Sequence, residues 1–483
     1  MNIQFRRQQP ERPGLISVFE NTSAMAGGRG GSGRWWQRFH RPIGIAKSAL
    51  PLVLGWAAFP AVAMAQEVAL PERQTSAAQG ESLGDSLLIS EAVGNTRSDV
   101  AEGVGEAVSA IEGGFAGRKG RWRIEPRLVI KGTYDDNIFI RRDNRVADYV
   151  GTLSPGLAFG FWDSVQARER DLDRLHAATA AVERSRGNFL IFDYTAILMG
   201  FSRTTSQNAL DHDARFDTQW KTGKLTLGAN VQFESKSETN NDVGGRLRRK
   251  TLSAGITSSY RFNEKLTLEL GLRNATNRPE GFARTTEWRG DISLDYSVTP
   301  SARFGFGFAA GLLQVDRGAD QVFQRVLARA GYSVSEKLDV EFRGGVEFRQ
   351  SDGRSGNRTS PIFDVRTSWT PSAGTRLRVS TYRRVGTAIE EPEEFVATSG
   401  VSLAFLRALH GSLYLSIEGG YEVADYLSIS REDKYFFVRP GLLYNFAKWG
   451  TASITYEYRC NDSNQTRSSY YNNQISFEIG CKY

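Results

Sequence analysis

From Arg121 to the last residue, hydrophobic and polar side chains alternate along the chain with a period of two. The clearest stretch interleaves polar residues with Leu266, Leu268, Leu270 and Leu272. Because successive side chains of a β-strand point to opposite faces, this spacing predicts strands with one apolar face and one charged or small face. About 18 such segments follow one another up to Tyr483, although 16 would also fit.

A period of two suits either a soluble sandwich with its apolar face inward or a transmembrane barrel with its apolar face outward. The predicted strands run to roughly 10–14 residues, which is long for a sandwich and sufficient to cross a bilayer at a tilt. Tight turns alternate with longer polar loops at 236–247, 274–284, 351–359 and 461–469. Aromatic residues precede the tight turns at near-constant spacing, as Tyr260, Tyr296, Tyr332 and Trp369. We therefore predict a closed, antiparallel, all-β transmembrane barrel with an aromatic belt at one membrane interface.

The C-terminus adds a specific signal. Apolar side chains occupy alternate positions up to an aromatic final residue, at Ile475, Phe477, Ile479, Cys481 and Tyr483. This ending resembles the terminal strand signal that the outer-membrane barrel assembly machinery reads. The simpler alternative is an ordinary last strand.

The N-terminal region carries the features of a secretory signal. A basic stretch precedes a short apolar core from Ala49 to Phe59, and Ala63-Met64-Ala65 supplies a cleavage pattern. We predict a signal peptide over residues 1–65, cleaved after Ala65; the alternative is an anchor that stays uncleaved. Residues 66–117 are acidic and poor in aromatics, which predicts a flexible periplasmic arm; the alternative is a small plug that folds into the pore. The barrel then occupies residues 118–483.

One insertion interrupts the strand pattern. Residues 165–186 place Val165, Leu172, Leu175, Ala178 and Val182 at helical spacing, where a short periplasmic turn is expected. The segment is predicted to be a short periplasmic helix, either packed under the barrel or exposed for a partner.

Composition and charge narrow the function classes. A helical membrane bundle would need several apolar runs of roughly 20 residues, and the chain has one, near its N-terminus. The net charge is +7. Since the basic residues of the barrel are spread along it and interleaved with acids, we expect no nucleic-acid partner.

Few residues suggest catalysis or a bound group. His212 stands between Asp211 and Asp213, but neighbours on a strand point to opposite faces. The alternation of faces along the strand, which we call parity, places His212 on the lipid side. Cys460 should lie opposite about Tyr471, too far from Cys481 for a disulfide. No catalytic, metal or cofactor motif is recognised, so we predict that the protein is not an enzyme and needs no cofactor.

The barrel interior is the remaining candidate. Parity places charged side chains of neighbouring strands inward as candidate pore-lining residues: Arg325, Arg329, Arg343, Arg366, Arg376, Arg378, Asp339, Glu341, Glu347 and Asp364. They could form an ion-pair lattice that stiffens the wall, or a basic strip that guides anionic solutes or acidic glycans.

The first hairpin carries a family likeness. Tyr134-Asp135-Asp136-Asn137-Ile138-Phe139, a polar loop and then Leu153-Ser154-Pro155-Gly156-Leu157 resemble the β-barrel porin type 2 family. The resemblance implies an outer-membrane barrel of a Gram-negative bacterium, often linked to capsule or exopolysaccharide systems. It contributes no catalytic residues.

Two functions stay open at this point. One is a porin-like channel that passes a hydrophilic solute or takes part in exopolysaccharide export. The other is a plugged structural or adhesin-like barrel that acts through its loops or its periplasmic arm. The expected partners are outer-membrane lipid, the barrel assembly machinery, and an anionic solute or polysaccharide with periplasmic export components.

Overall fold

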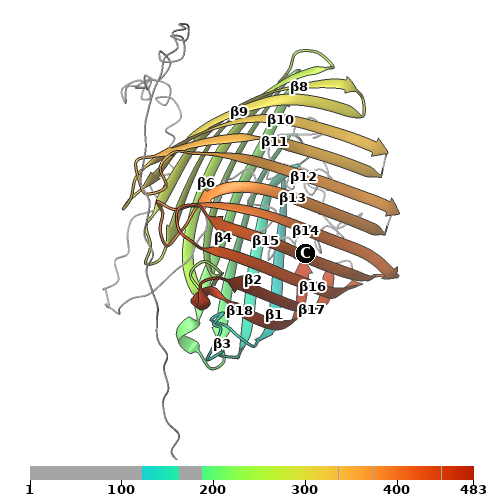
Figure 1. The fold of residues 1–483 in the computed structure, drawn as a ribbon. Helices are drawn as coiled ribbons and strands as arrows, with labels where there is room; N and C mark the ends of the chain where they lie inside the picture. The colour runs from blue at the N-terminus through green and yellow to red at the C-terminus, as the bar shows by residue number, and fades with distance from the viewer. Residues whose placement is uncertain (1–121, 163–187, 336, 373, 448, 483) are drawn as a thin grey trace, which may run out of the picture. The chain divides into compact units, whose positions relative to one another are not determined.

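The computed structural model describes residues 122–162, 188–335, 337–372, 374–447 and 449–482, which form one sheet of 18 strands (Figure 1). The strands are β1 (Trp122–Asp135), β2 (Asp148–Trp162), β3 (Phe189–Phe201), β4 (Ala209–Thr222), β5 (Leu225–Asn240), β6 (Gly245–Arg261), β7 (Leu266–Pro279), β8 (Thr285–Thr299), β9 (Ala302–Val315), β10 (Gln321–Ser335), β11 (Leu338–Ser351), β12 (Arg358–Ser372), β13 (Thr375–Thr387), β14 (Phe395–His410), β15 (Leu413–Tyr426), β16 (Glu432–Ala447), β17 (Gly450–Ser463) and β18 (Tyr470–Lys482). Within these ranges, no helix is long and apolar enough to cross a membrane.

Every strand pairs antiparallel with its neighbours in sequence, and the first strand pairs with the last. β1 and β18 are in register from Arg127 opposite Lys482 to Asp135 opposite Gln474. The sheet is therefore a closed barrel without an edge, so its backbone groups are paired as a lipid environment requires. This confirms the predicted fold class and the predicted count of 18 strands.

The two ends of the barrel differ. Two-residue turns, such as that between β8 and β9, lie at the end where β1 begins and β18 ends. We call this the periplasmic end, because both termini of an outer-membrane barrel lie on that side. Beside it the aromatic repeat is exposed, as predicted, at Tyr260, Tyr296, Tyr332 and Trp369. The other end, with the longer connections, is called the outer end.

The predicted outer loops are too long. Residues 236–247 and 274–284 were expected to be loops, but β5 continues to Asn240, β6 starts at Gly245 and β7 reaches Pro279. Likewise, β11 and β12 extend into 351–359, and β17 extends into 461–469. The physical reason is that hydrophobic alternation stops at the membrane boundary, whereas backbone pairing continues beyond it.

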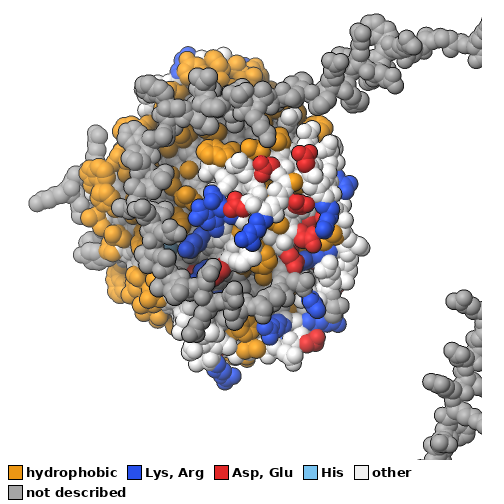
Figure 2. Space-filling model, turned by 90° about the vertical axis from the view of Figure 1, so that its left-hand side faces the viewer, with side chains coloured by type: hydrophobic (Ala, Val, Ile, Leu, Met, Phe, Trp, Pro, Cys, Tyr) orange, Lys and Arg blue, Asp and Glu red, His pale blue; other side chains and the backbone are white. Residues whose placement is uncertain are grey.

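The direction of the side chains separates the two architectures that a period of two allows. Large apolar residues are exposed on the outer surface, with Phe306 75% and Ile256 52% accessible, while inward neighbours such as Arg325 and Asn472 are 2% and 0% accessible. An apolar exterior around a charged interior is typical of a barrel in lipid and opposite to a soluble sandwich. Figure 2, drawn from the left-hand side of Figure 1, shows acidic and basic side chains gathered beside one another, with hydrophobic side chains toward one margin.

Several predictions from the sequence fall outside the described residues. They are the signal peptide at 1–65, the arm at 66–117, the helical insertion at 165–186 and the final aromatic, Tyr483. Ile475, Phe477 and Ile479 of the C-terminal signal lie outward and exposed on β18.

Candidate functional site

The inner wall holds the charged residues that parity selected. The ten candidates lie on four neighbouring strands, Arg325 and Arg329 on β10, Asp339, Glu341, Arg343 and Glu347 on β11, Asp364 and Arg366 on β12, and Arg376 and Arg378 on β13. Their sequence neighbours on the same strands, such as Val326 and Phe342, are exposed on the outside. All ten thus share the inward parity, and their role in lining a pore stays a prediction.

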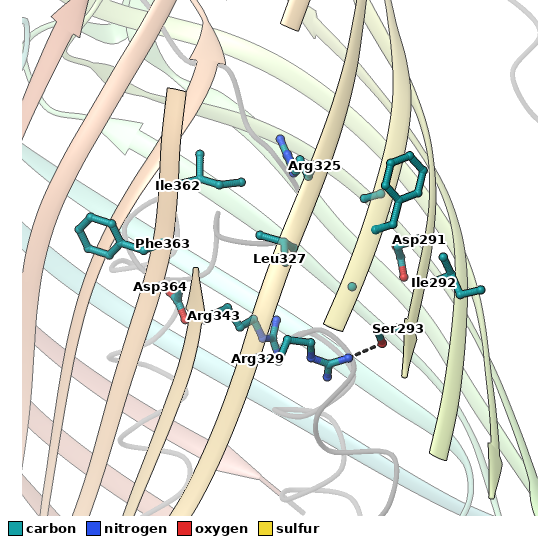
Figure 3. A pocket seen from close by; sticks show the side chains of 13 residues that line it. Asp291, Ile292, Ser293, Arg325, Leu327, Arg329, Arg343, Ile362, Phe363 and Asp364 are labelled. Atoms are coloured by element: carbon teal, nitrogen blue, oxygen red, sulfur yellow. Dashed lines mark hydrogen bonds between the residues drawn. The ribbon is translucent and has the colours of Figure 1, made fainter. Parts of the chain in front are cut away.

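Arg329 joins three strands. Its Nη1 lies 2.8 Å from Glu269 Oε2 on β7 and 3.1 Å from Asp295 Oδ2 on β8. The same nitrogen donates a hydrogen bond to Ser293 (Figure 3). Arg329 therefore extends across β9, the strand that separates β10 from β8.

A glycine makes this reach possible. Gly305 on β9 stands opposite both Arg329 and Asp295, and a Cβ there would lie 1.9 Å from Asp295 Oδ1. We call such an arrangement, in which a polar contact passes over an inward glycine of the middle strand, a glycine-bridged row.

The glycine-bridged row recurs around the wall. Arg303 on β9 passes over Gly331 and meets Glu341 on β11 at 2.8 Å. Tyr382 on β13 donates across Gly400 to Glu422 on β15. Because a side chain at the glycine would block each contact, these inward glycines tie strands that are not direct neighbours.

Toward the outer end, the wall of β10 and β11 is tightly packed. Glu347 accepts from Arg325 Nε at 2.6 Å and from Arg349 Nε at 2.7 Å, and it is 1% accessible. Both guanidinium groups lie over the Phe323 ring, at 4.7 Å and 5.0 Å from its centroid. These pairs favour the ion-pair lattice for this part of the wall.

Between Arg329 and this layer lies a small cavity of about 60 Å³. Its polar lining includes Asp291, Ser293, Arg343 and Asp364, and Figure 3 shows their side chains turned toward the same space. Asp291 Oδ1 and Asp364 Oδ2 have no hydrogen-bond partner within the described part of the chain. Most of the lining is apolar and includes Phe308, Leu327 and Ile362, so the cavity has room for a few water molecules only beside its polar groups.

Several inward charged groups are not among the ten predicted residues. Arg289 on β8 is 1% accessible, with Glu287 and Asp291 at 3.8 Å, and its guanidinium nitrogens donate no hydrogen bond to the described residues. Arg439 on β16 binds Glu418 and Glu457, each at 3.1 Å. Strand parity alone could have found these residues, because all of them lie at inward positions.

The remaining basic candidates differ in their surroundings. Arg366 lies 3.9 Å from Asp364. Arg376 and Arg378 are near the periplasmic end of β13, and Arg378 is exposed. Asp339 accepts from Ser333 at 2.6 Å. The lower part of the β13 wall is thus the more accessible part.

The outer opening is crossed by a bridge of side chains. Asp242, in the turn between β5 and β6, is 5% accessible and accepts from Tyr426 at the end of β15. Arg431, in the next loop, lies 3.6 Å from Asp242 and 2.6 Å from Asp433. Since β5 and β15 stand on opposite sides of the ring of strands, these contacts span the mouth.

The loop between β13 and β14 joins the same bridge. Its Ile389 N–H donates to Asp242 at 3.4 Å, and Glu393 accepts from the Ala319 N–H at 3.1 Å. Burial raises the pKa of Asp242 well above its ordinary value, and it also raises the pKa of Glu390. The mouth therefore holds partly desolvated acids within reach of Arg431.

The first-hairpin motif acts at the seam between β1 and β18. Asp135 accepts from Asn472 Nδ2 at 2.6 Å and from Gln474 Nε2 at 2.7 Å, while Asn137 Nδ2 donates to the Tyr471 carbonyl at 3.0 Å. Burial opposes ionisation of Asp136 in the adjoining loop, but hydrogen bonds from Asn473 and Arg145 lower its pKa. The motif thus fastens the closing pair of strands.

The residues considered for catalysis and disulfide formation lie as parity predicted. His212 faces outward and its Nδ1 is 2.9 Å from the Tyr194 hydroxyl. Cys460 stands opposite Tyr471, and both cysteines are free.

Comparison with known proteins identifies a family for part of the barrel. Residues 285–483 match the family described as Putative beta-barrel porin 2, which is the family that the first hairpin resembles. No curated protein matches the sequence significantly.

Several solved outer-membrane channels are similar to the barrel. The OccAB4 structure of Acinetobacter baumannii is 10% identical, with a TM-score of 0.41 over 74% of this chain and 98% of that one. OpdK of Pseudomonas aeruginosa with vanillate is 10% identical, with a TM-score of 0.40 over 77% and 100%. The channel DcaP of Acinetobacter baumannii is 12% identical, with a TM-score of 0.40 over 77% and 100%.

Proposed function

Since the chain forms a porin-type β-barrel of the outer membrane, we propose that it is a passive channel for hydrophilic solutes with a preference for anions. The observation that carries the proposal is the inner wall of β10 to β13, where arginines outnumber acids among the ten candidate residues. A charged wall of this kind is stable only with water or ion pairing, and a net basic wall attracts anions.

The arginines are proposed to have two roles. Arg325 and Arg329, held by buried carboxylates, stiffen the wall and fix its shape. Arg376 and Arg378, at the more accessible end of β13, guide solutes electrostatically. A passing anion can approach cations at this accessible part of the wall, and a net basic lining favours its entry.

The test is ion selectivity in planar bilayers. The full barrel, reconstituted from purified outer membranes, should conduct and should favour chloride over potassium. The variant R376E/R378E should shift the permeability ratio toward cations, whereas K434E, which changes a cation on the outer surface, should not. An unchanged permeability ratio in R376E/R378E would refute the proposed guiding role of these two arginines. Absence of conductance in the wild type would refute the channel function.

We also propose that the transported material is linked to an acidic exopolysaccharide. The support is the resemblance of the first hairpin to a family often found with such systems. A strain lacking this chain should secrete less acidic polysaccharide, measured as uronic acid in the medium, and the wild-type gene should restore it. Equal polysaccharide secretion with and without the chain would refute the link to exopolysaccharide and leave the channel function as proposed.

A plugged or adhesin-like barrel is the second candidate, because the Asp242–Tyr426 contact spans the outer mouth. In that case conductance should be absent in the wild type and should appear when the contact is weakened, for example in Y426F.

A further inference from the structure

The outer surface of β6 and β7 carries cations that the channel does not use. Arg248, Lys250 and Arg278 are exposed and lie on the same face as the lipid-facing Leu252, Leu270 and Leu272. Lys250 stands directly opposite Arg278 in the pairing of the two strands. Their side chains thus project side by side from the outside of the barrel.

The height of this cationic patch follows from strand geometry. Lys250 is ten residues from Tyr260 of the periplasmic aromatic belt, about 34 Å along the strand. At a tilt of about 40° this is about 26 Å along the barrel axis, close to the height of the apolar band of outer-membrane barrels. Lys250 and Arg278 therefore lie at the outer boundary of the band, at the level of the lipid headgroups.

The electrostatics of the patch favour a bound anion. Like charges directly opposite one another across strands destabilise a sheet, and their Cα atoms are about 5 Å apart. Among the described residues, neither Lys250 nor Arg278 makes an ion pair; Arg248 donates to Ser237 at 3.3 Å and stands opposite Glu280. By contrast, the outward Lys434 on β16 is paired with Glu432 at 2.8 Å.

The neighbouring groups indicate what kind of anion fits. Hydroxyl and amide side chains flank the cations on the same face, at Ser237, Asn274 and Thr276. Below them Leu252, Ile256 and Leu272 offer an apolar surface. A ligand with phosphate groups above several acyl chains matches both parts of this surface.

We propose that Lys250 and Arg278 form a binding site for the phosphate groups of lipid A, the phosphorylated glycolipid of the outer leaflet. The acyl chains of the same molecule would lie along Leu252 and Leu272. The proposal depends on the outer-membrane location and not on conduction, so it can fail or hold independently of the channel.

The experiment measures lipid binding to the purified full chain in detergent by native mass spectrometry. Bisphosphorylated lipid A should bind the wild type at least about tenfold more tightly than lipid A from which both phosphates have been removed. K250Q/R278Q should lose this difference, and the single variants K250Q and R278Q should each lose part of it. K434Q is the matched control, an outer-surface cation that already has a partner, and it should bind like the wild type.

The outcomes are distinct. Equal binding of both lipids by the wild type, or equal binding of bisphosphorylated lipid A by wild type and K250Q/R278Q, would overturn the site. Full competition by inorganic phosphate at millimolar concentration would assign the patch to free phosphate and overturn the lipid assignment. Folding of each variant is checked by its heat-dependent shift on gels, and the single variants keep the test decisive where the double variant does not fold.

Discussion

Replacing Arg329 by methionine isolates the energy of one glycine-bridged row. The substitution keeps an unbranched apolar stem but removes the guanidinium group that faces Glu269 and Asp295. The side chains of Arg329 and Glu269 are only 10% and 5% accessible, so Glu269 and Asp295 would lose the cation that they share in a poorly hydrated wall. Removing one partner of a buried pair lowers stability by about 3–5 kcal/mol, and we expect R329M to fall in this range.

A second pair of equal length shows why burial decides the size of the effect. Lys434 and Glu432 are also 2.8 Å apart, but their side chains are 47% and 44% accessible. Water replaces the lost partner there, so K434M should cause no measurable loss of stability. The N–O distance alone would predict equal effects for the two variants.

The assay is urea unfolding of the barrel in detergent micelles, followed by tryptophan fluorescence with its slope checked against the wild type. The double variant E269Q/R329M should recover part of the lost free energy of unfolding, because it also removes the negative charge of Glu269. If R329M proved as stable as K434M, or if E269Q/R329M recovered nothing, the reasoning from burial and charge would be refuted.

Three further predictions concern the wall and the mouth. G305V places a Cβ 1.9 Å from Asp295 Oδ1 and 2.8 Å from the Leu294 carbonyl oxygen. The variant should therefore melt several degrees or more below the wild type in heat-modifiability gels. A wild-type melting temperature would show that the glycine-bridged row tolerates a side chain at this position. Y426F removes a hydrogen bond to the buried Asp242, which is worth about 1–3 kcal/mol. The closed times in single-channel recordings should therefore become shorter by about fivefold or more. Closed times equal to those of the wild type would contradict the bridge across the mouth. Burial raises the pKa values of Asp242 and Glu390, which favours the protonated acids in the bridge, so the bridge should be most stable in acid and weaken as pH rises through the raised pKa. Conductance noise should increase accordingly in the wild type and depend less on pH in D242N, and an equal dependence would assign the effect to other groups.

The alternation of side chains was sufficient to predict most of the architecture. The period of two predicted the strands, their number and their two faces, because neighbouring side chains of any strand must point in opposite directions. The same rule placed His212 outward, and antiparallel pairing across the loop at 461–469 placed Cys460 opposite Tyr471; the structure agrees at both positions. The alternation did not predict the outer ends of β5 to β7, because polar side chains occupy both faces there although the backbone remains paired.

Parity also selected inward residues on β10 to β13, but it gave no partners for them. That Arg329 meets Glu269, sixty residues earlier in the chain, depends on the register of β7 to β10 and on the glycine at position 305. The acidic loop between β13 and β14 gave no signal of its own. Its contact with Asp242 joins opposite sides of the ring of strands. The two residues are so far apart in the sequence that no local pattern predicts their contact.

The sequence by itself determined which face of each strand meets lipid, since that depends only on the spacing of apolar residues. Tertiary structure alone decided which charges neutralise one another, which glycines let side chains pass and what crosses the mouth. Those contacts form only after 18 strands close in one register, because closure brings together groups that are hundreds of residues apart.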